Sequence, residues 1–435
     1  RSSRGFSGCF CPLGSRAAGW RATCVLWFMR PPAHIFAKCF TLLTPFIAST
    51  APPSRSFRCA PLAALRMASR SERFGRAALA GSTADLSREE LLGIAACCVP
   101  PLEGTVKGGA GRVATIGGSL EYTGAPYFAA AAALRAGVDL SHVFCDRTAG
   151  GPIKSYSPEL IVHPLLASAS PGDEAPEASH AARVEAGVGA VGPWVPRCDA
   201  FLVGPGLGRD PAVMEATARL VVEIIACNRR VVLDADGLFI LSSALAATPR
   251  TPSQEALVAA IKSSPERVIV TPNKVEFERL CSAVGIAGGE RGGDAFARAE
   301  TLAAQVARGI GANVLMIVKG PRDVISDGTE TISCGAEGSP RRAGGQGDVL
   351  AGLTLAFQLW SQREGNAGLA EREAKGSWCS GRRLDLACAF AACEVARGCA
   401  RTAFAKHRRA MLANDLLAEV GPTFHEMFPP EESAE

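Results

Sequence analysis

A glycine-rich turn that leads into a helix carries much of the chemistry that the sequence suggests. Residues 338–352 read GSPRRAGGQGDVLAG, with two arginines, closely spaced glycines and one carboxylate ahead of an apolar run. The unpaired amides at the start of such a helix, at the positive end of its dipole, form a site for an anion such as a phosphate. The pattern lacks the Lys-Ser/Thr ending of a P-loop, so a different phosphate-binding turn is expected.

Asp348 would lie in the first turn of this helix, beside the anion. A carboxylate at that position has two interpretations. It can accept hydrogen bonds from the free amides as a helix cap, or it can take the proton from a hydroxyl group that attacks the phosphate. The local pattern alone does not decide between a cap and a base.

Apolar segments alternate with helical segments from Arg112 onward, which indicates a parallel sheet with helices on both faces, an α/β domain. A short hairpin is expected around Asp327 and Gly328. The expected strand segments are 112–116, 140–145, 158–164, 199–204, 229–237, 266–273 and 312–320, and the expected helices are 125–136, 212–227, 275–284, 294–309, 349–357, 385–400 and 414–428.

Ligands bind such a sheet at the carboxyl ends of its strands, where loops lead into helices. Turns rich in glycine or polar residues follow the expected strands, and we expect them to meet at that edge. They are GGSLEYTGAP (117–126), GPGLGRD (204–210), DADG (234–237), TPNKVEF (271–277), KGPRD (319–323) and GGQGD (344–348). Their convergence is more informative than any one turn.

Two of these turns allow a functional and a structural interpretation. GPGLGR lacks the third glycine of a dinucleotide fingerprint, because Arg209 stands there, so a Rossmann dehydrogenase is disfavoured. Its glycines let the backbone approach a ligand or simply form a tight turn. Asp234 and Asp236 can hold a hydrated magnesium ion or bond neighbouring loops.

The other turns are equally open. Lys319 and Asp323 can hold part of a nucleotide, but such a lysine is often only a solvated charge. Asn273 can cap the following helix with or without facing the site. Tyr122 is either a stacking platform or an aromatic residue at the rim.

Composition bounds the partners. The chain of 435 residues has 46 basic and 42 acidic residues, a balance that does not indicate nucleic acid or a membrane surface as the main partner. The sixteen cysteines form no paired CxxC knuckles, so buried reduced thiols are expected. The six histidines show no metal-ligand spacing.

The first hundred residues differ from the rest. No acidic residue precedes Glu72, and the segment is rich in Arg, Ser and Ala, which resembles an organelle transit peptide. We expect 1–100 to be a targeting leader, mitochondrial or alternatively plastid, or an upstream extension of a cytoplasmic protein. No stretch is apolar and long enough to span a bilayer. The catalytic domain is expected at 101–430, with surface insertions at 165–197 and 361–383.

The motifs together resemble a known family. GxGD before a helix, late in an α/β chain, resembles the ribokinase superfamily. The ordered set RVATIGGSLEYTGAPYFAA, SYSPELIVHP, GPGLGRD, DADGL, TPNKVEF, KGPRD and GSPRRAGGQGD is similar to the ATP-dependent (S)-NAD(P)H-hydrate dehydratases, from about residue 102 to about residue 424. Ala343 departs from this pattern, since a cysteine is expected there.

The resemblance implies a ribokinase-like three-layer α/β/α fold and a lyase of metabolite repair, which uses ATP and Mg²⁺ to return hydrated NADH and NADPH to the normal cofactors. It implies Asp348 as the base and a functional link to an NAD(P)H-hydrate epimerase. The residues implied for the hydrated dinucleotide are Gly206, Asn273, Lys274, Val275, Glu276, Phe277, Glu278, Arg279 and Asp348. Those implied for ATP are Lys319, Gly320, Pro321, Arg322, Asp323, Gly338, Ser339, Pro340, Arg341, Arg342, Ala343, Gly344, Gly345, Gln346 and Gly347.

Two rival functions remain at this stage. One is a vitamin or sugar kinase of the same superfamily, which would release a stable phosphorylated product. The other is a non-catalytic nucleotide-binding protein on a kinase scaffold, against which the intact GGQGD argues. The sequence does not decide between ATP and ADP, between NADH and NADPH, or between a monomer and a homo-oligomer, and it assigns no metal ligands.

Overall fold

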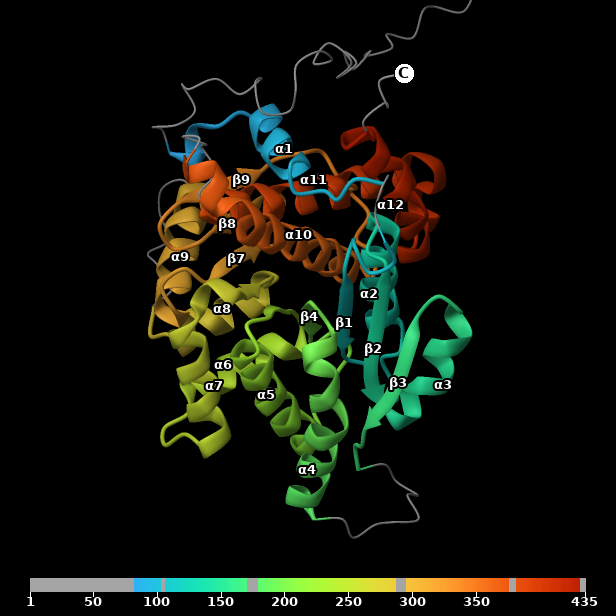
Figure 1. Ribbon diagram of the computed structural model, residues 1–435, viewed down its shortest axis with the longest axis vertical. Coiled ribbons are helices and arrows are strands. Elements are labelled where there is room, and N and C mark those ends of the chain that lie inside the picture. The colour runs from blue at the N-terminus through green and yellow to red at the C-terminus, as the bar shows by residue number, and fades with distance from the viewer. Residues whose placement is uncertain (1–81, 103–105, 170–178, 287–294, 375–380, 431–435) are drawn as a thin grey trace, which may run out of the picture. The chain divides into compact units, whose positions relative to one another are not determined.

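A nine-stranded sheet forms the centre of the described part of the chain (Figure 1). The computed structural model describes residues 82–102, 106–169, 179–286, 295–374 and 381–430, all within one compact unit, 67–435. The strand order is β3-β2-β1-β4-β5-β6-β7-β8-β9. The strands are β1 (Arg112–Ile116), β2 (Leu140–Asp146), β3 (Ile161–Leu166), β4 (Ala200–Val203), β5 (Arg230–Leu233), β6 (Val268–Val270), β7 (Leu315–Val318), β8 (Asp323–Ser326) and β9 (Thr331–Cys334).

Strands β1 to β7 run parallel, and β8 and β9 form an antiparallel hairpin at one edge. The expected parallel sheet and the hairpin are therefore confirmed. The chain builds the sheet outward from β1 in one direction and then from β4 in the other. The crevice between the carboxyl ends of β1 and β4 is thus the switch point where open α/β sheets bind ligands.

Helices cover both faces of the sheet, because successive strand residues point to opposite sides. On β4, Phe201 and Val203 join one hydrophobic core while Leu202 joins the other. One face is covered by α1 (Arg88–Ala96), α2 (Gly124–Ala136), α10 (Gln346–Ala374), α11 (Gly381–His407) and α12 (Ala413–Met427). The other carries α4 (His180–Val191), α5 (Pro211–Ala226), α6 (Asp236–Ala246), α7 (Pro252–Ser263), α8 (Lys274–Ala283) and α9 (Ala295–Ile310), and α3 (Arg147–Tyr156) packs by β2 and β3.

The folded domain begins earlier than residue 101. Helix α1 starts at a capping box formed by Ser87 and Glu90, and it buries Leu91 and Leu92 in the core shared with α11. Arg88 forms an ion pair with the buried Glu394 of α11, at 2.6 Å. The expected leader, 1–100, therefore extends too far along the chain. The acid-poor composition on which it rests ends before this helix.

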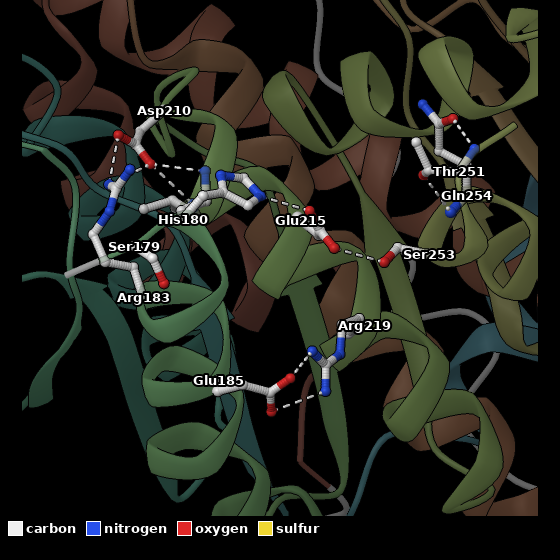
Figure 2. A network of polar contacts seen from close by, with 12 residues as sticks. Ser179, His180, Arg183, Glu185, Asp210, Glu215, Arg219, Thr251, Ser253 and Gln254 are labelled. Carbon is white, nitrogen blue, oxygen red and sulfur yellow. Dashed lines mark hydrogen bonds and ion pairs between the residues drawn. The ribbon is translucent and has the colours of Figure 1, made fainter.

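The segment 165–197 is not simply a surface insertion. Its helix α4 packs against α5. Two ion pairs, Arg183–Asp210 and Arg219–Glu185, and a hydrogen bond between His180 and Glu215 join α4 to α5 and its N-cap (Figure 2). Glu215 also accepts a hydrogen bond from Ser253 of α7. The small residues of α4 allow this close packing. Alanine and glycine are also common in loops, so the composition of this segment does not distinguish a helix from a surface insertion. Residues 170–178 lie outside the described residues.

The second expected insertion, 361–383, is helical at both ends. α10 continues to Ala374 and α11 begins at Gly381, so only 375–380 lie outside the described residues. None of the described helices is both long enough and apolar enough to cross a bilayer. Most of the described cysteines are buried, and the buried ones are free thiols, as expected.

The sequence patterns missed the helices α3, α6 and α7. Helix α3 contains Gly150, Gly151 and Pro152, residues that usually interrupt a helix. Helix α6 directly follows a turn whose residue Ala235 has φ 48° and ψ −115°, a backbone conformation that few side chains tolerate. These features hide α3 and α6 from sequence patterns, whereas α7 does carry a local signal, because Thr251 and Gln254 form a capping box and Pro252 stands at its first position.

Gly352 allows α10 to cross α2 closely. A Cβ atom at this position would lie 2.0 Å from the carbonyl oxygen of Ala129 in α2, so the helices would have to separate. We expect Gly352→Ala to lower the free energy of unfolding by about 2 kcal/mol through overpacking, as measured by urea denaturation. Gly421→Ala in α12 is the control, because nothing lies within 4 Å of its new Cβ atom, and the variant should be neutral or slightly more stable. Equal effects of both substitutions would contradict this view of the crossing.

Candidate active site

Three neighbouring parallel strands end in residues that bond one another. Asp234 directly follows β5, Thr271 follows β6 and Lys319 follows β7. The Lys319 Nζ atom donates to Asp234 Oδ1 at 2.6 Å, and the Thr271 hydroxyl donates to the same oxygen at 2.8 Å. The side chains of Lys319 and Asp234 are 17% and 3% exposed. The DADG, TPN and KG turns therefore converge, as expected from the sheet.

The start of α10 lies beside this ion pair. A Cβ atom on Gly347 would be 3.6 Å from the Lys319 Nζ atom, so the ammonium group faces the first turn of the helix that carries Asp348. Gly345 has φ 93°, and a side chain there would collide with Phe128 of α2 and Ala413 of α12. The glycine turn is thus fixed by packing, and it brings Asp348 near the ends of β5 and β7.

Asp348 is held in an environment that favours its neutral form. Burial, reinforced by the negative charge of Asp234, raises the pKa of Asp348 to about 7, although Lys319 acts in the opposite direction. A carboxyl group with this pKa is partly ionised at neutral pH and can both take up and release a proton. The backbone hydrogen bond that acts on this carboxyl group comes from its own residue.

Glu276 adds a third carboxylate to the same edge. Burial raises its pKa, and Lys319 opposes this effect. The same carboxylates act on the lysine in return: burial alone would lower the pKa of Lys319, but its acidic neighbours, Asp234 first, raise it above the ordinary value. Lys319 is therefore charged over the physiological range.

Asn273 is a true helix cap. Its side-chain oxygen accepts hydrogen bonds from Val275 N at 2.9 Å and Glu276 N at 3.1 Å, while the Glu276 carboxylate accepts one from Asn273 N. This capping box holds Glu276 at the end of β6, where it senses Lys319. Asn273 thus acts as a cap that also orients a residue of the site.

The other residues of 273–279 divide by their position on α8. Phe277 has an exposed fraction of 8%, and it anchors α8 in the hydrophobic core. Lys274, Val275 and Glu278 are exposed. Arg279 lies over the ring of Phe239 at 5.4 Å, and Arg209 lies over the same ring at 4.2 Å. The arginines thus link the TPNKVEF and GPGLGRD turns.

The GPGLGRD turn packs on the loop that follows β1. Gly206 has φ 60°, and its carbonyl accepts a hydrogen bond from Gly118 N at 3.1 Å. A side chain on Gly206 would meet the backbone of Tyr122. Tyr122 itself is 61% exposed, which places it at the rim and not inside a pocket. A cavity of about 230 Å³ opens beside these turns, lined by Ser119, Asp146, Ser168, Gly208, Arg209 and Asp210 among others.

Asp234 and Asp236 bond neighbouring loops. Asp234 binds Lys319 and Thr271, and Asp236 accepts hydrogen bonds from Gly208 N at 3.0 Å and Arg209 Nε at 3.4 Å. Among the described residues, no group of three or more His, Cys, Asp or Glu side chains could hold a metal ion. Both carboxylates thus bond neighbouring loops, as one of the two interpretations predicts.

Asp323 belongs to a structural clamp. It accepts a hydrogen bond from Gly320 N at 3.0 Å and forms an ion pair with Arg397 of α11 at 2.7 Å. Arg397 also donates to the carbonyl oxygens of Gly320, Pro321 and Ala336. The side chain of Arg397 on α11 thus holds the KGPRD turn in place. Sequence analysis missed Arg397, because it stands in the middle of an alanine-rich helix with no motif around it.

The remaining basic turn precedes α10. Ser339 accepts a hydrogen bond from Arg341 N at 3.0 Å, and Gln346 donates to the Arg341 carbonyl at 2.9 Å. The Arg341 side chain reaches the carbonyl of Met411, whereas Arg342 is exposed. Arg322 lies over the ring of Phe296 at 4.7 Å, near the same end of the sheet. Arg342 and Gly344 therefore face solvent where an anion would arrive.

Comparison with known proteins identifies the family. A family model described as NAD(P)H-hydrate dehydratase matches residues 113–421. The chain belongs to this family. A Bos taurus protein named ATP-dependent (S)-NAD(P)H-hydrate dehydratase is 40% identical over 325 residues, which cover 74% of this chain and 84% of that protein. The Homo sapiens protein of the same name is 39% identical over 331 residues, covering 76% of this chain and 82% of that protein.

Solved structures support the fold of this dehydratase-family chain. A ribokinase-like superfamily protein of Enterococcus faecalis V583 matches with a TM-score of 0.53 and 19% identity, over 79% of this chain and 96% of that chain. At this identity the likeness concerns the fold alone. The expected three-layer, ribokinase-like architecture is confirmed by this match and by the sheet with helices on both faces.

The raised pKa of Asp348 predicts a pH-dependent effect on stability. Its folded-state pKa of about 7 exceeds the ordinary 3.8, so the folded wild type loses stability as pH rises through this window. We expect Asp348→Asn to be more stable than the wild type by about 2 kcal/mol at pH 8, and by much less at pH 4 to 5. Urea unfolding at both pH values measures this. Glu255→Gln, an exposed carboxylate on α7, is the control, and a pH-independent difference for Asp348→Asn would contradict the raised pKa.

The clamp on the KGPRD turn predicts a large loss of stability. Arg397→Leu leaves the buried Asp323 carboxylate without its cation, so we expect the free energy of unfolding to fall by about 3 kcal/mol. The double variant with Asp323→Leu should regain much of this loss, because no buried charge remains. Arg401→Leu, which removes an exposed arginine one turn later on α11, should cost less than about 0.5 kcal/mol. If Arg397→Leu is as stable as Arg401→Leu, Arg397 does not clamp the turn.

Proposed function

We propose that this chain is an ATP-dependent (S)-NAD(P)H-hydrate dehydratase, which returns hydrated NADH and NADPH to the normal cofactors. Membership in the family supports the substrate, since the similar Bos taurus and Homo sapiens proteins carry this name. The observation that carries the chemistry is Asp348, a carboxyl group with a pKa of about 7 at the start of a helix and beside a charged lysine.

The chemistry divides into two steps. The ring hydroxyl of the hydrate is a poor leaving group, but its phosphate ester leaves readily. Asp348 accepts the hydroxyl proton as the hydroxyl oxygen attacks the γ-phosphorus of ATP, and ADP leaves with the electron pair of the broken P–O bond. Phosphate then departs from the ring with the electron pair of the C–O bond, pushed by the lone pair of the ring nitrogen. A proton is lost from the adjacent ring carbon, and its C–H electrons restore the double bond of the reduced nicotinamide.

The residues at the helix start suit the developing negative charge. The backbone amides of 344–347 span the start of α10, where the helix dipole is positive, and Lys319 faces Gly347. The Asn273–Arg279 segment and Gly206 line the neighbouring loops, where we place the hydrated dinucleotide. The turns at Lys319–Asp323 and Gly338–Gly347 are left for ATP.

Magnesium belongs to this proposal as a companion of the nucleotide. The described residues form no cluster of three or more ligands, which fits an ion bound mainly by phosphate oxygens and water. Within the same proposal, an epimerase would supply the (S) form of the hydrate, and the arginine-rich, acid-free segment before Glu72 would direct the chain to a mitochondrion.

A repair assay tests the function. The wild-type protein with hydrated NADH, ATP and magnesium is expected to restore the absorbance of reduced nicotinamide and to release ADP and phosphate in equal amounts. If the absorbance does not recover and a vitamin or sugar is phosphorylated to a stable product, the protein is a kinase instead. A protein that binds ATP but turns over neither kind of substrate would be the non-catalytic rival.

Asp348→Asn tests the base in the same assay. We expect turnover to fall by more than about 100-fold, the smallest loss typical of a general base, while ATP binding measured by calorimetry is retained. Glu255→Gln should keep wild-type turnover, since this residue is exposed on α7. Residual activity of Asp348→Asn above about a hundredth would mean that Asp348 is not the base.

A further inference from the structure

Asp234 has no place in the mechanism described so far, although its carboxylate is buried at this edge of the sheet. Its side chain is 3% exposed, and one oxygen, Oδ1, accepts hydrogen bonds from both Lys319 and Thr271. Two donors on one oxygen, from two neighbouring strand ends, fix the orientation of the carboxylate. A buried carboxylate held in this way cannot reach a substrate freely, so its role must act through its partners.

The backbone around Asp234 is also fixed. A Cβ atom on Gly204 would lie 1.9 Å from the Asp234 carbonyl oxygen, and that carbonyl accepts a hydrogen bond from Gly237 N at 2.8 Å. The next residue, Ala235, has the strained angles φ 48° and ψ −115°. Strain of this kind persists only where the surroundings impose it, and it is found mostly at functional sites. The fold therefore holds Asp234 in place at an energetic cost.

Lys319 is the partner that reaches the reacting groups. The distance of 3.6 Å from its Nζ atom to the Cβ position of Gly347 puts the ammonium group against the first turn of α10. Gly347 brings no side chain between the ammonium group and the helix, and Asp348 is the next residue. The ammonium group, the amides of the helix start and the base thus lie close together.

We infer that Asp234 is a positioning residue of the phosphoryl-transfer site, which holds the Lys319 ammonium group against the start of α10 so that it neutralises the transferred phosphoryl group. This inference rests on the proposed function. In the step concerned, the hydroxyl proton passes to Asp348, the hydroxyl oxygen bonds to the γ-phosphorus, and the bond to ADP breaks. Lys319 keeps its protons throughout, so Asp234 contributes orientation and charge, and no atom of it is transferred.

The charge of Asp234 affects the pKa values of both Asp348 and Lys319. Asp348 is influenced by Asp234, Lys319 and Glu276, and Lys319 by the carboxylates of Asp234, Glu276 and Asp348. Removing the charge of Asp234 takes a like charge from the base and an opposite charge from the lysine. Both groups would then release their protons at lower pH.

The decisive variant is Asp234→Asn, whose amide has the same size and can still accept from Lys319 and Thr271. The acid limb of the pH–rate profile reports ionisation of Asp348, and the alkaline limb reports loss of the Lys319 proton. We expect both limbs to move to lower pH by about one unit, together with a lower kcat. A uniform loss of rate with both limbs unmoved would show a merely structural role and would overturn the inference, as would an unchanged profile.

Asp236→Asn is the matched control. It makes the same chemical change two residues later in the same turn, but Asp236 bonds Gly208 and Arg209 instead of the lysine. Whatever its effect on the rate, it should leave both limbs in place. Equal shifts in the two variants would mean that any charge in this turn acts on the base, and Asp234 would then hold no special position.

A double-mutant cycle tests whether Asp234 acts through the lysine. If it does, Asp234→Asn lowers kcat by about 10-fold in the wild type but has little effect in the Lys319→Met background. Additive losses would contradict the inference. If Asp234→Asn does not fold, as judged by circular dichroism, Thr271→Val tests the same link. It removes one of the two donors to Asp234 Oδ1, and its effect on kcat should likewise vanish with Lys319→Met.

A measurement without substrate separates this inference from the proposed function. Carbon-13 NMR of aspartate-labelled protein follows the titration of Asp348, whose signal is assigned with Asp348→Asn. Asp234→Asn should lower the observed pKa by about one unit even if the wild type fails to repair hydrated NADH. An inactive wild type would refute the function alone, whereas an unmoved titration would refute the role of Asp234.

Discussion

Close contact between backbones at the ends of β1, β4 and β5 is the constraint on which the rest of the structure depends. A side chain on Gly117 would lie 2.2 Å from the Pro205 carbonyl oxygen, and one on Gly204 would overlap the carbonyl of Asp234. The turns after these strands therefore stack without any side chain between them. The polar side chains that follow β5, β6 and β7 are Asp234, Thr271 and Lys319. The register of the sheet sets their positions relative to one another.

The balance of charge at that edge explains how one carboxyl group can differ so much from the others. One largely buried lysine, Lys319, acts on Asp234, Glu276 and Asp348. Asp234 has the short ion pair with it, while burial and the charge of Asp234 raise the pKa of Asp348 to about 7. A fold that offered each carboxylate its own cation would be more stable, but it would contain no group ready to exchange a proton near neutral pH.

The sheet, its parallel order and the meeting of the strand-end turns could be predicted from the sequence, because buried strands and glycine turns leave strong local patterns. The glycine turn and the strand-end turns also single out Asp348 and Lys319 as candidates, and their roles in the reaction stay predictions. Arg397 could not be found, since its partners lie on a turn more than seventy residues earlier and nothing in the alanine-rich helix marks it. The pairing of Asp234 with Lys319 was missed for a related reason: which of several carboxylates a lysine approaches depends on three-dimensional register and not on composition.

The packing of α1 has a consequence for how the chain can be matured. Ser82 and Thr83 bind the Glu330 carboxylate at the β8–β9 hairpin, and Leu91 and Leu92 fill the core beside α11. A protease that cut after this point would expose that apolar surface and leave the buried Glu394 without Arg88. The residues from Ser82 onward are therefore part of the folded domain, and removing them would destabilise it.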